Sequence, residues 1–266
     1  MSDWRAYDTV AEAYERVTAP RFETVARDLL ALARPAEGTR LLDLGTGTGA
    51  VAVAMADVLE APGRLVGCDL SLPMLSRARH RAPWLCPVLA DAARLPFRSG
   101  SFDLVTANCV LSHLKDYRRG LREIRRVLGR PAGLAASCWG PLSDPYAEAW
   151  RELLASAVGD DAVQHAIETV VPWERHFSSP DNVRTALLEA GFGGVRAEVF
   201  TLASDQPVEG YIADRALGAA GRFARHTLGE IGGRDFLGRA ESEFRRRFGE
   251  RIRYNRPVVL GVGTVV

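Results

Sequence analysis

A glycine-rich stretch, Gly45-Thr46-Gly47-Thr48-Gly49, directly follows the apolar run that begins at Leu41. Glycine allows a tight turn with positive φ and lets a ligand approach bare backbone near the first turn of a helix. Gly45, Gly47 and Ala50 also satisfy the G-x-G-x-x-G/A pattern of dinucleotide sites. The glycines therefore predict a nucleotide-type cofactor, and by themselves they admit NAD as readily as S-adenosylmethionine.

Three aspartates lie at or after the ends of successive apolar runs, and their negative charges help to distinguish between the two cofactors. Asp43 stands two residues before Gly45, where a carboxylate would repel a pyrophosphate but would suit the cationic amino-acid end of S-adenosylmethionine. Asp69 lies about 20 residues after the glycines, where an acid can bind ribose hydroxyls. Asp91 can accept a hydrogen bond from an adenine amino group. Each could instead be a solvated loop acid or a helix cap, but the charge of Asp43 favours S-adenosylmethionine over a dinucleotide.

Polar and aromatic candidates lie after the fourth apolar run and near the N-terminus. His113 could take a proton from an acceptor hydroxyl or amine, although it could equally contact only the cofactor. Asn108 could flank the cofactor or form an Asx-turn, and Tyr14 could contact the cofactor or pack under a helix. The other histidines have no metal-ligand spacing, and the four cysteines show no C-x-x-C pair. We therefore expect no metal site and no disulfide.

Between Thr39 and Gly140, short apolar runs alternate with helical stretches, a pattern typical of a parallel sheet with helices on both faces. Two later runs with alternating or β-branched residues complete the sheet. The predicted strands are Arg40–Leu44, Arg64–Asp69, Val88–Ala90, Phe102–Ala107, Leu134–Trp139, Val195–Leu202 and Pro257–Val266. The predicted helices include Ala50–Leu59, Leu72–Arg79, Tyr117–Leu128 (capped by Asp116), Val208–Leu217 and Phe236–Phe248, with a break in the helical pattern at Gly229–Gly233.

We expect residues 1–266 to form one domain. Its sheet core would comprise residues 38–140, 180–202 and 257–266, and three mainly helical pieces, 1–37, 141–179 and 203–256, would form a lid over the sheet. Aromatic side chains in or beside the lid could line an apolar acceptor pocket or form the core of the lid: Trp139, Tyr146, Trp150, Trp173, Phe177 and Tyr211.

The balance of charge identifies no partner. The formal net charge is +1, so no overall field draws the protein to nucleic acid or to an anionic membrane. No apolar run reaches the roughly 18 residues of a membrane span, and the start lacks the layout of a signal peptide. We expect a cytoplasmic protein that binds a small-molecule acceptor, no nucleic acid and no membrane. The oligomeric state stays open, with a homodimer as one alternative.

Leu42-Asp43-Leu44-Gly45-Thr46-Gly47-Thr48-Gly49 resembles motif I of the class I S-adenosylmethionine-dependent methyltransferases, a family that includes ubiquinone/menaquinone-biosynthesis-type and many small-molecule enzymes. Further stretches resemble the family in the same order, over roughly Tyr7 to Gly140. The turn before the fifth strand departs from the family's Arg-Pro-Gly-Gly. The matching stretches are Tyr7-Asp8 through Tyr14-Glu15, Asp69-Leu70-Ser71-Leu72-Pro73-Met74-Leu75, Asp91-Ala92-Ala93-Arg94-Leu95-Pro96-Phe97, and Phe102 to Asn108 with Leu111-Ser112-His113-Leu114.

The resemblance implies a Rossmann-like α/β fold with a seven-stranded, mostly parallel sheet whose last strand is antiparallel. It implies transfer of a methyl group from S-adenosylmethionine to a small organic molecule, such as a natural-product or quinone-like acceptor. A protein that binds the cofactor but has been repurposed or inactivated is the alternative. His113 is the catalytic candidate on the chemistry of its side chain. The residue positions and the resemblance together give these cofactor-binding candidates: Tyr14, Asp43, Gly45, Thr46, Gly47, Gly49, Asp69, Leu70, Met74, Asp91, Ala92 and Asn108.

Overall fold

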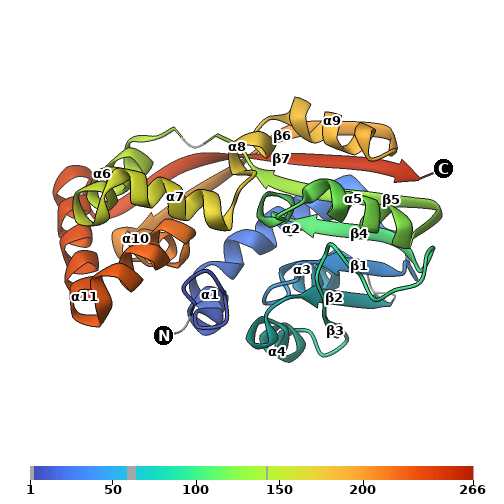
Figure 1. The fold of residues 1–266 in the computed structure, drawn as a ribbon, viewed down its shortest axis with the longest axis horizontal. Coiled ribbons are helices and arrows are strands. Elements are labelled where there is room, and N and C mark those ends of the chain that lie inside the picture. Colours follow the sequence, from blue (N-terminus) through green and yellow to red (C-terminus); the bar gives the residue numbers. More distant parts are fainter. Residues whose placement is uncertain (1–2, 59–63, 142, 266) are drawn as a thin grey trace.

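A computed structural model describes residues 3–58, 64–141 and 143–265. Its centre is a seven-stranded sheet in the order β3-β2-β1-β4-β5-β7-β6, with β1 to β5 parallel and β7 antiparallel to both β5 and β6 (Figure 1). This confirms the predicted mostly parallel sheet. The strands are β1 Leu41–Leu44, β2 Leu65–Asp69, β3 Cys86–Leu89, β4 Phe102–Asn108, β5 Leu128–Trp139, β6 Gly193–Pro207 and β7 Arg251–Val265.

Helices cover both faces of the sheet because alternate residues of each buried strand point to opposite sides. Leu42 and Leu44 of β1 pack into the cluster under α5, α8 and α9, whereas Leu41 packs into the cluster under α2, α3 and α4. The helices that make these two layers are α2 Ala19–Ala33, α3 Ala50–Val58, α4 Leu72–Arg81, α5 Tyr117–Val127, α8 Glu174–Phe177 and α9 Pro180–Glu189.

A third group of elements forms the lid at the carboxyl ends of the parallel strands (Figure 1). Its own core contains Trp150, Tyr211, Phe236 and Phe244. The long helix α11 bends where Gly229 leaves helical geometry, with φ 71°, at the start of the predicted break. The lid elements are α1 Ala11–Val17, α6 Pro145–Val158, α7 Asp160–Val170, α10 Val208–Leu217 and α11 Ala219–Phe248, and the short helix η1 Leu111–His113 lies at the end of β4.

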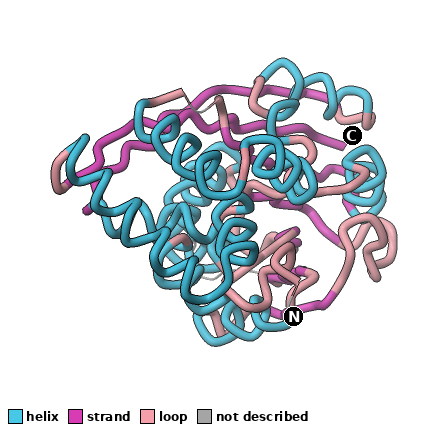
Figure 2. Tube along the Cα trace, turned by 60° about the vertical axis from the view of Figure 1, so that its left-hand side comes forward, coloured by secondary structure: helices cyan, strands magenta, loops and turns pink. Residues whose placement is uncertain are grey.

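Strands β6 and β7 are longer than predicted. Beyond the end of β5 they continue as a two-stranded ribbon, paired from Leu202 opposite Arg256 to Pro207 opposite Arg251, that reaches the lid helices (Figure 2). Ile252 and Tyr254 of this ribbon belong to the core of the lid. The expected lid segment 203–256 therefore begins and ends in β-structure.

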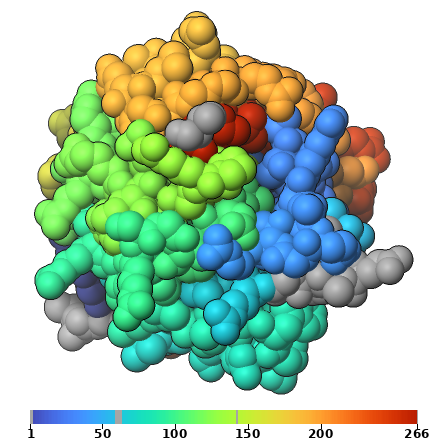
Figure 3. All heavy atoms as spheres, turned by 90° about the vertical axis from the view of Figure 1, so that its right-hand side faces the viewer, coloured from blue at the N-terminus to red at the C-terminus, as the bar shows by residue number. Residues whose placement is uncertain are grey.

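The first expected lid piece also differs from its predicted role. Val25, Ala26, Leu29 and Leu30 of α2 are buried against the sheet, so within the described part of the segment 1–37 most of α2 packs on a face of the sheet instead of covering the strand ends. Predicted residues Leu59 and Val266 lie outside the described residues. At the end of the molecule away from the lid, the red end of β7 lies below the orange segment that contains α9 (Figure 3). Among the described helices, none is both long enough and apolar enough to cross a membrane.

Candidate functional site

The glycine loop joins β1 to α3, and its three glycines all have positive φ: 62° at Gly45, 53° at Gly47 and 87° at Gly49. They serve different purposes. A Cβ on Gly45 would lie 2.6 Å from Cγ2 of Val110, and one on Gly49 would lie 3.2 Å from Cα of Ala78. At Gly47 the nearest atom would be the Gly45 carbonyl oxygen at 4.0 Å. Gly45 and Gly47 line a large cavity, whereas Gly49 packs the loop onto α4.

Asp69, at the end of β2, connects the glycine loop to the start of α4. Its Oδ2 accepts a hydrogen bond from the Gly47 N–H at 2.9 Å, and its Oδ1 accepts one from the Ser71 N–H at 2.9 Å. Burial raises the pKa of the Asp69 carboxyl, and these backbone donors oppose the rise. The carboxylate therefore lines the cavity in a fixed orientation beside the bare backbone of the loop.

Asp43 lies behind the loop and does not line the cavity. Its side chain is 1% exposed, and its Oδ1 accepts a hydrogen bond from the Thr106 hydroxyl at 2.8 Å. Burial raises the pKa of the Asp43 carboxyl to about 7, although the hydroxyls of Thr46 and Thr106 oppose the rise. Thr46 is buried as well, and its N–H donates to the Cys68 carbonyl at 3.0 Å. Asp43 and Thr46, both predicted to bind the cofactor, are thus buried on the side of the loop that faces away from the cavity.

The predicted cofactor-binding residues that follow β2 and β3 line the same cavity. Asp91, Ala92, Leu70 and Met74 all line it. Asp91 is exposed, and its Oδ1 accepts a hydrogen bond from the N–H of Ala93 at 2.8 Å. The structure thus brings together the two carboxylates, Asp69 and Asp91, that the sequence placed after successive strands.

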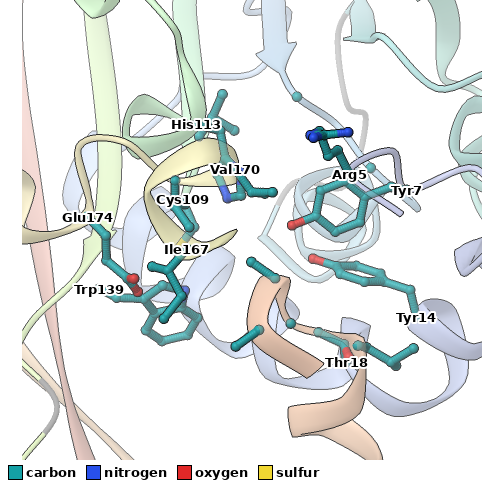
Figure 4. A pocket seen from close by; sticks show the side chains of 18 of the residues that line it. Arg5, Tyr7, Tyr14, Thr18, Cys109, His113, Trp139, Ile167, Val170 and Glu174 are labelled. Atoms are coloured by element: carbon teal, nitrogen blue, oxygen red, sulfur yellow. The ribbon is translucent and has the colours of Figure 1, made fainter. Parts of the chain in front are cut away.

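At the middle of the cavity, Asn108 and Tyr14 lie between the sheet and the N-terminal helices. The Asn108 amide donates to the Phe22 carbonyl at 3.0 Å, and its oxygen accepts from the Ser137 hydroxyl at 2.7 Å, so Asn108 links β4 to α2 and β5. The Tyr14 ring stacks on Phe22 at 5.8 Å between centroids. Figure 4 shows Tyr14 pointing to the side on which Cys109 and His113 lie.

His113, at the end of η1, lines the same part of the cavity. Its ring packs edge-on against Tyr7 at 6.1 Å between centroids. Burial, followed by the positive charge of Arg222, lowers the pKa of His113 to about 4, and the Val170 carbonyl opposes the fall. At neutral pH the imidazole is therefore uncharged, as a proton acceptor requires, but it would hold an accepted proton weakly.

The cavity continues past Trp139, at the end of β5, to the lid, and charged side chains line this second half. Arg21 makes an ion pair with Asp214, whose Oδ1 also accepts a hydrogen bond from the Thr18 hydroxyl at 3.0 Å. Glu174 points toward Trp139 (Figure 4). Arg215 and Arg256 line this half as well.

Only two of the six predicted acceptor-pocket aromatics, Trp139 and Trp150, line the cavity. Tyr146 and Tyr211 pack into the core of the lid. Trp173 and Phe177 instead surround Tyr117 on a face of the sheet, with centroids 4.8 and 4.9 Å from its ring. Four of the six predicted aromatics are therefore structural: two belong to the core of the lid and two pack against the sheet.

The volume of the cavity is about 1210 Å³. A pocket for one drug-sized ligand occupies roughly 300–1,000 Å³. The cavity therefore has room for a nucleotide-type cofactor along the strand ends and a second molecule under the lid.

Comparison with known proteins identifies the family. Residues 42–136 match the profile of the methyltransferase domain family. A malonyl-[acyl-carrier protein] O-methyltransferase from Halorhodospira halophila is 35% identical over 81% of this chain and 70% of its own length. A protein of the same name from Geobacter sulfurreducens is 32% identical over 97% of this chain and 96% of its own. A nocamycin O-methyltransferase from Saccharothrix syringae is 33% identical, covering 71% of this chain and 72% of that one.

The chain belongs to the class I S-adenosylmethionine-dependent methyltransferases. The cofactor of this family is S-adenosylmethionine. Solved structures share the fold. YcgJ from Bacillus subtilis has a TM-score of 0.59 at 18% identity, covering 91% of this chain and 98% of its own. A Haemonchus contortus phosphoethanolamine N-methyltransferase in complex with S-adenosylhomocysteine also has 0.59, at 16% identity, covering 99% of this chain and 61% of that chain.

The loop edge of the methyltransferase fits this cofactor. Gly47 leaves backbone bare toward the cavity, because a Cβ there would meet no atom closer than 4.0 Å. The carboxylate of Asp69 stands beside it, ready to accept hydrogen bonds from hydroxyls. Membership of the family decides between a dinucleotide and S-adenosylmethionine, the choice that the glycine pattern left open.

The charged residues of the lid half were not predicted from the sequence. They come from elements far apart in the chain, and no motif links them. One local signal was present: Ile252, Tyr254 and Arg256 are buried in alternation with exposed residues of β7. Period-two burial indicates a strand with one covered face, and it could have shown that Arg256 faces the interior of the methyltransferase.

Proposed function

We propose that the methyltransferase binds S-adenosylmethionine along the carboxyl ends of β1, β2 and β4 and methylates an organic acceptor under the lid. The ribose hydroxyls would bind Asp69, the adenine would lie toward Asp91 and Met74, and the methionine end would lie over Gly45 and Asn108. The observation that carries this proposal is the continuity of one cavity from Asp69 to the lid.

The acceptor class that we propose is a natural-product or quinone-like compound. Its support comes from the names of relatives, which include a nocamycin O-methyltransferase and demethylmenaquinone methyltransferases. Part of the lid half is apolar, with Trp139, Trp150, Leu154 and Ile167 among its lining residues. Such walls suit the ring or chain of an organic molecule.

The cofactor supplies a methyl group already activated by the sulfonium. The protein then has to align an acceptor atom with that group and exclude water from the nucleophile. The strand ends fix one side, and α1, α6, α7 and α10 enclose the other. For a hydroxyl acceptor, neutral His113 is the group that we propose to receive the proton.

A turnover assay with mass detection tests this proposal. The protein is incubated with S-adenosylmethionine and a panel of phenols, quinols and hydroxylated natural products, and both S-adenosylhomocysteine and methylated product are measured. We expect both to form in equal amounts, and Asp69→Ala to abolish the reaction at low cofactor concentration.

Asp103→Ala is the matched control. Asp103 is a carboxylate at the opposite end of the sheet, where it pairs with Arg40 outside the cavity, so this variant should retain activity. Tight binding of S-adenosylhomocysteine by calorimetry, without methylation of any acceptor in the panel, would favour the repurposed binding protein instead.

A further inference from the structure

Three arginines from three distant elements meet at the lid half of the cavity: Arg21 of α2, Arg215 of α10 and Arg256 of β7. The side chain of Arg256 is only 7% exposed, and that of Arg21 is 19% exposed. The guanidinium carbon of Arg256 lies 4.1 Å from the centre of the Trp139 ring, and that of Arg21 lies 5.1 Å from it. The fold has therefore gathered positive charge around one aromatic ring inside the protein.

Arg21 is the only one of these three side chains with a close acidic partner among the described residues, Asp214. The nearest carboxylate oxygen to Arg256 belongs to Glu174, at 3.8 Å from Nη2, and the Arg256 side chain makes no hydrogen bond to a described residue. Its Nε is buried without a partner. A buried cation with unsatisfied donors is costly to maintain, which points to a missing acceptor.

Arg215 also has buried N–H donors without partners. Within the described part of the chain it forms no ion pair, and its Nε and Nη2 are buried without hydrogen-bond partners. Its guanidinium carbon lies 4.8 Å from the centre of the Tyr211 ring. The positive charges of Arg215 and Arg21, after burial itself, lower the pKa of Arg256 to about 10, which agrees with their proximity.

The acidic groups of this region do not balance the arginines. The two carboxylates paired with Arg21 or near Arg256 are Asp214 and Glu174, and the lining of the lid half also contains Glu148, Arg151 and Arg175, so the arginines there still outnumber the carboxylates. Asp144 caps α6 by accepting a hydrogen bond from the Ala147 N–H at 2.7 Å, and it does not line the cavity. The excess of positive charge favours an anionic group on the ligand.

We propose that Arg215 and Arg256 bind a carboxylate group of the methyl acceptor, which would make the substrate an organic acid. The planar guanidinium group presents N–H donors in its own plane, a geometry suited to both oxygens of a carboxylate. An aromatic ring under the guanidinium leaves those edge donors free. The inference rests on the proposed function, because it places the acceptor in the lid half of the cavity.

A binding experiment with simple probes tests this site without turnover. The protein is saturated with S-adenosylhomocysteine and titrated with benzoate, with its neutral analogue benzamide, and with inorganic phosphate, and binding is followed by calorimetry and by tryptophan fluorescence. We expect benzoate to bind and to change the fluorescence, because Trp139 lies under the arginines. Benzamide and phosphate should bind at least about tenfold more weakly, the loss expected for a charge-assisted hydrogen-bond pair.

Arg256→Gln and Arg215→Gln should each weaken benzoate binding by about tenfold or more while leaving the affinity for S-adenosylhomocysteine within about twofold. Arg253→Gln is the matched control, because Arg253 lies on the exposed side of the same strand and pairs with Asp205. If Arg256→Gln fails to fold, Arg215→Gln supplies the same comparison.

Three results would overturn the inference. Equal binding of benzoate and benzamide would remove the charge requirement, and tighter binding of phosphate would replace the carboxylate. An equal loss of S-adenosylhomocysteine affinity in Arg256→Gln would assign the arginines to the carboxylate of the cofactor. Failure of the proposed function has a different signature, because absence of methyl transfer would leave benzoate binding intact.

Discussion

The two halves of the cavity differ in how the chain builds them. The cofactor half is made of loop backbone and short side chains at the ends of neighbouring parallel strands, from Leu44 to His113 in the sequence. The lid half is made of long side chains from segments as distant as Arg21 and Arg256. A local stretch of sequence therefore builds one half, whereas the other exists only after the N-terminal helices, α10 and the β6–β7 ribbon have packed together.

The two halves also differ in charge. Asp69 and Asp91 line the cofactor half, whereas the guanidinium groups of Arg215 and Arg256, with buried donors unsatisfied, line the lid half. Opposite charges at the two ends of one cavity favour a cationic ligand at the first and an anionic ligand at the second. Substitutions in the cofactor half should therefore change cofactor affinity, and substitutions in the lid half should change only the handling of the acceptor.

The largest effect is expected at Gly45. Gly45→Val adds a Cβ that would lie 2.6 Å from Val110 Cγ2, at a φ of 62° that a β-branched residue rarely adopts. We expect S-adenosylhomocysteine affinity to fall by more than about 100-fold and the free energy of unfolding to fall by about 2–3 kcal/mol. Calorimetry and urea unfolding measure the two effects.

Gly38→Ala is the control for backbone strain alone. Gly38 has a φ of 78°, a Cβ there would meet no atom within 4 Å, and the residue does not line the cavity. The variant should lose about 1 kcal/mol of stability and keep its cofactor affinity. Normal cofactor binding by Gly45→Val would show that the loop is not built around the cofactor.

The next effect separates the two acids of the cofactor half. Asp69→Ala should weaken S-adenosylhomocysteine binding by about 2–3 kcal/mol, because Asp69 is partly buried and held by two backbone donors. Asp91→Ala should cost about 0.5–1 kcal/mol, because Asp91 is exposed. Calorimetry on both variants measures the difference, and a larger loss at Asp91 would reverse the proposed order of the two contacts.

Stability as a function of pH should reveal Asp43 and His113 as opposing groups. The pKa of Asp43 rises from 3.8 to about 7 on folding, so its carboxyl destabilises the folded protein increasingly as pH rises through this window. The pKa of His113 falls from 6.5 to about 4, so its contribution to stability is lost as pH falls from 6.5 toward 4. The two trends largely cancel where they overlap.

Replacing one of the two groups should reveal the pH dependence of stability that the other one causes. Between pH 4.5 and 6.5 (roughly the window in which both groups titrate), the unfolding free energy of Asp43→Asn should rise with pH relative to wild type, and that of His113→Gln should fall. Each slope should be about 1 kcal/mol per pH unit by urea unfolding. His165→Gln, at an exposed position, should follow wild type. Parallel curves for all four proteins would show that neither group titrates abnormally.

The last prediction concerns His113, which lies between the two halves of the cavity. His113→Gln should lower turnover about tenfold at saturating substrate while cofactor affinity stays within about twofold, because a base with a pKa near 4 contributes little proton affinity. The wild-type rate should stay level from pH 8 down to about 5. A loss of cofactor affinity with unchanged turnover would instead place His113 among the cofactor contacts.

Part of the cofactor half was predictable because its residues follow the strands in order. In a parallel sheet the carboxyl ends of the strands meet at one edge, so a regular pattern of strand, loop and acid predicts that Asp69 and Asp91 converge. The same reasoning placed Asp43 in direct contact with the cofactor, but Asp43 lies behind the loop, bound to Thr106 of the neighbouring strand. Which face of β1 carries Asp43 depends on what packs there, and the four-residue strand is buried throughout.

The sequence by itself determined the fold class, the position of the cofactor loop and the helical character of the lid, because each depends on local periodicity and on glycine conformations within a short stretch. Tertiary structure alone decided that β6 and β7 extend into the lid and that Arg21, Arg215 and Arg256 meet around Trp139. Arg21 and Arg256 lie 235 positions apart in the sequence, and no local signal links them to each other or to Arg215. Their proximity depends on the packing of the whole chain, and so does the chemistry of the acceptor half.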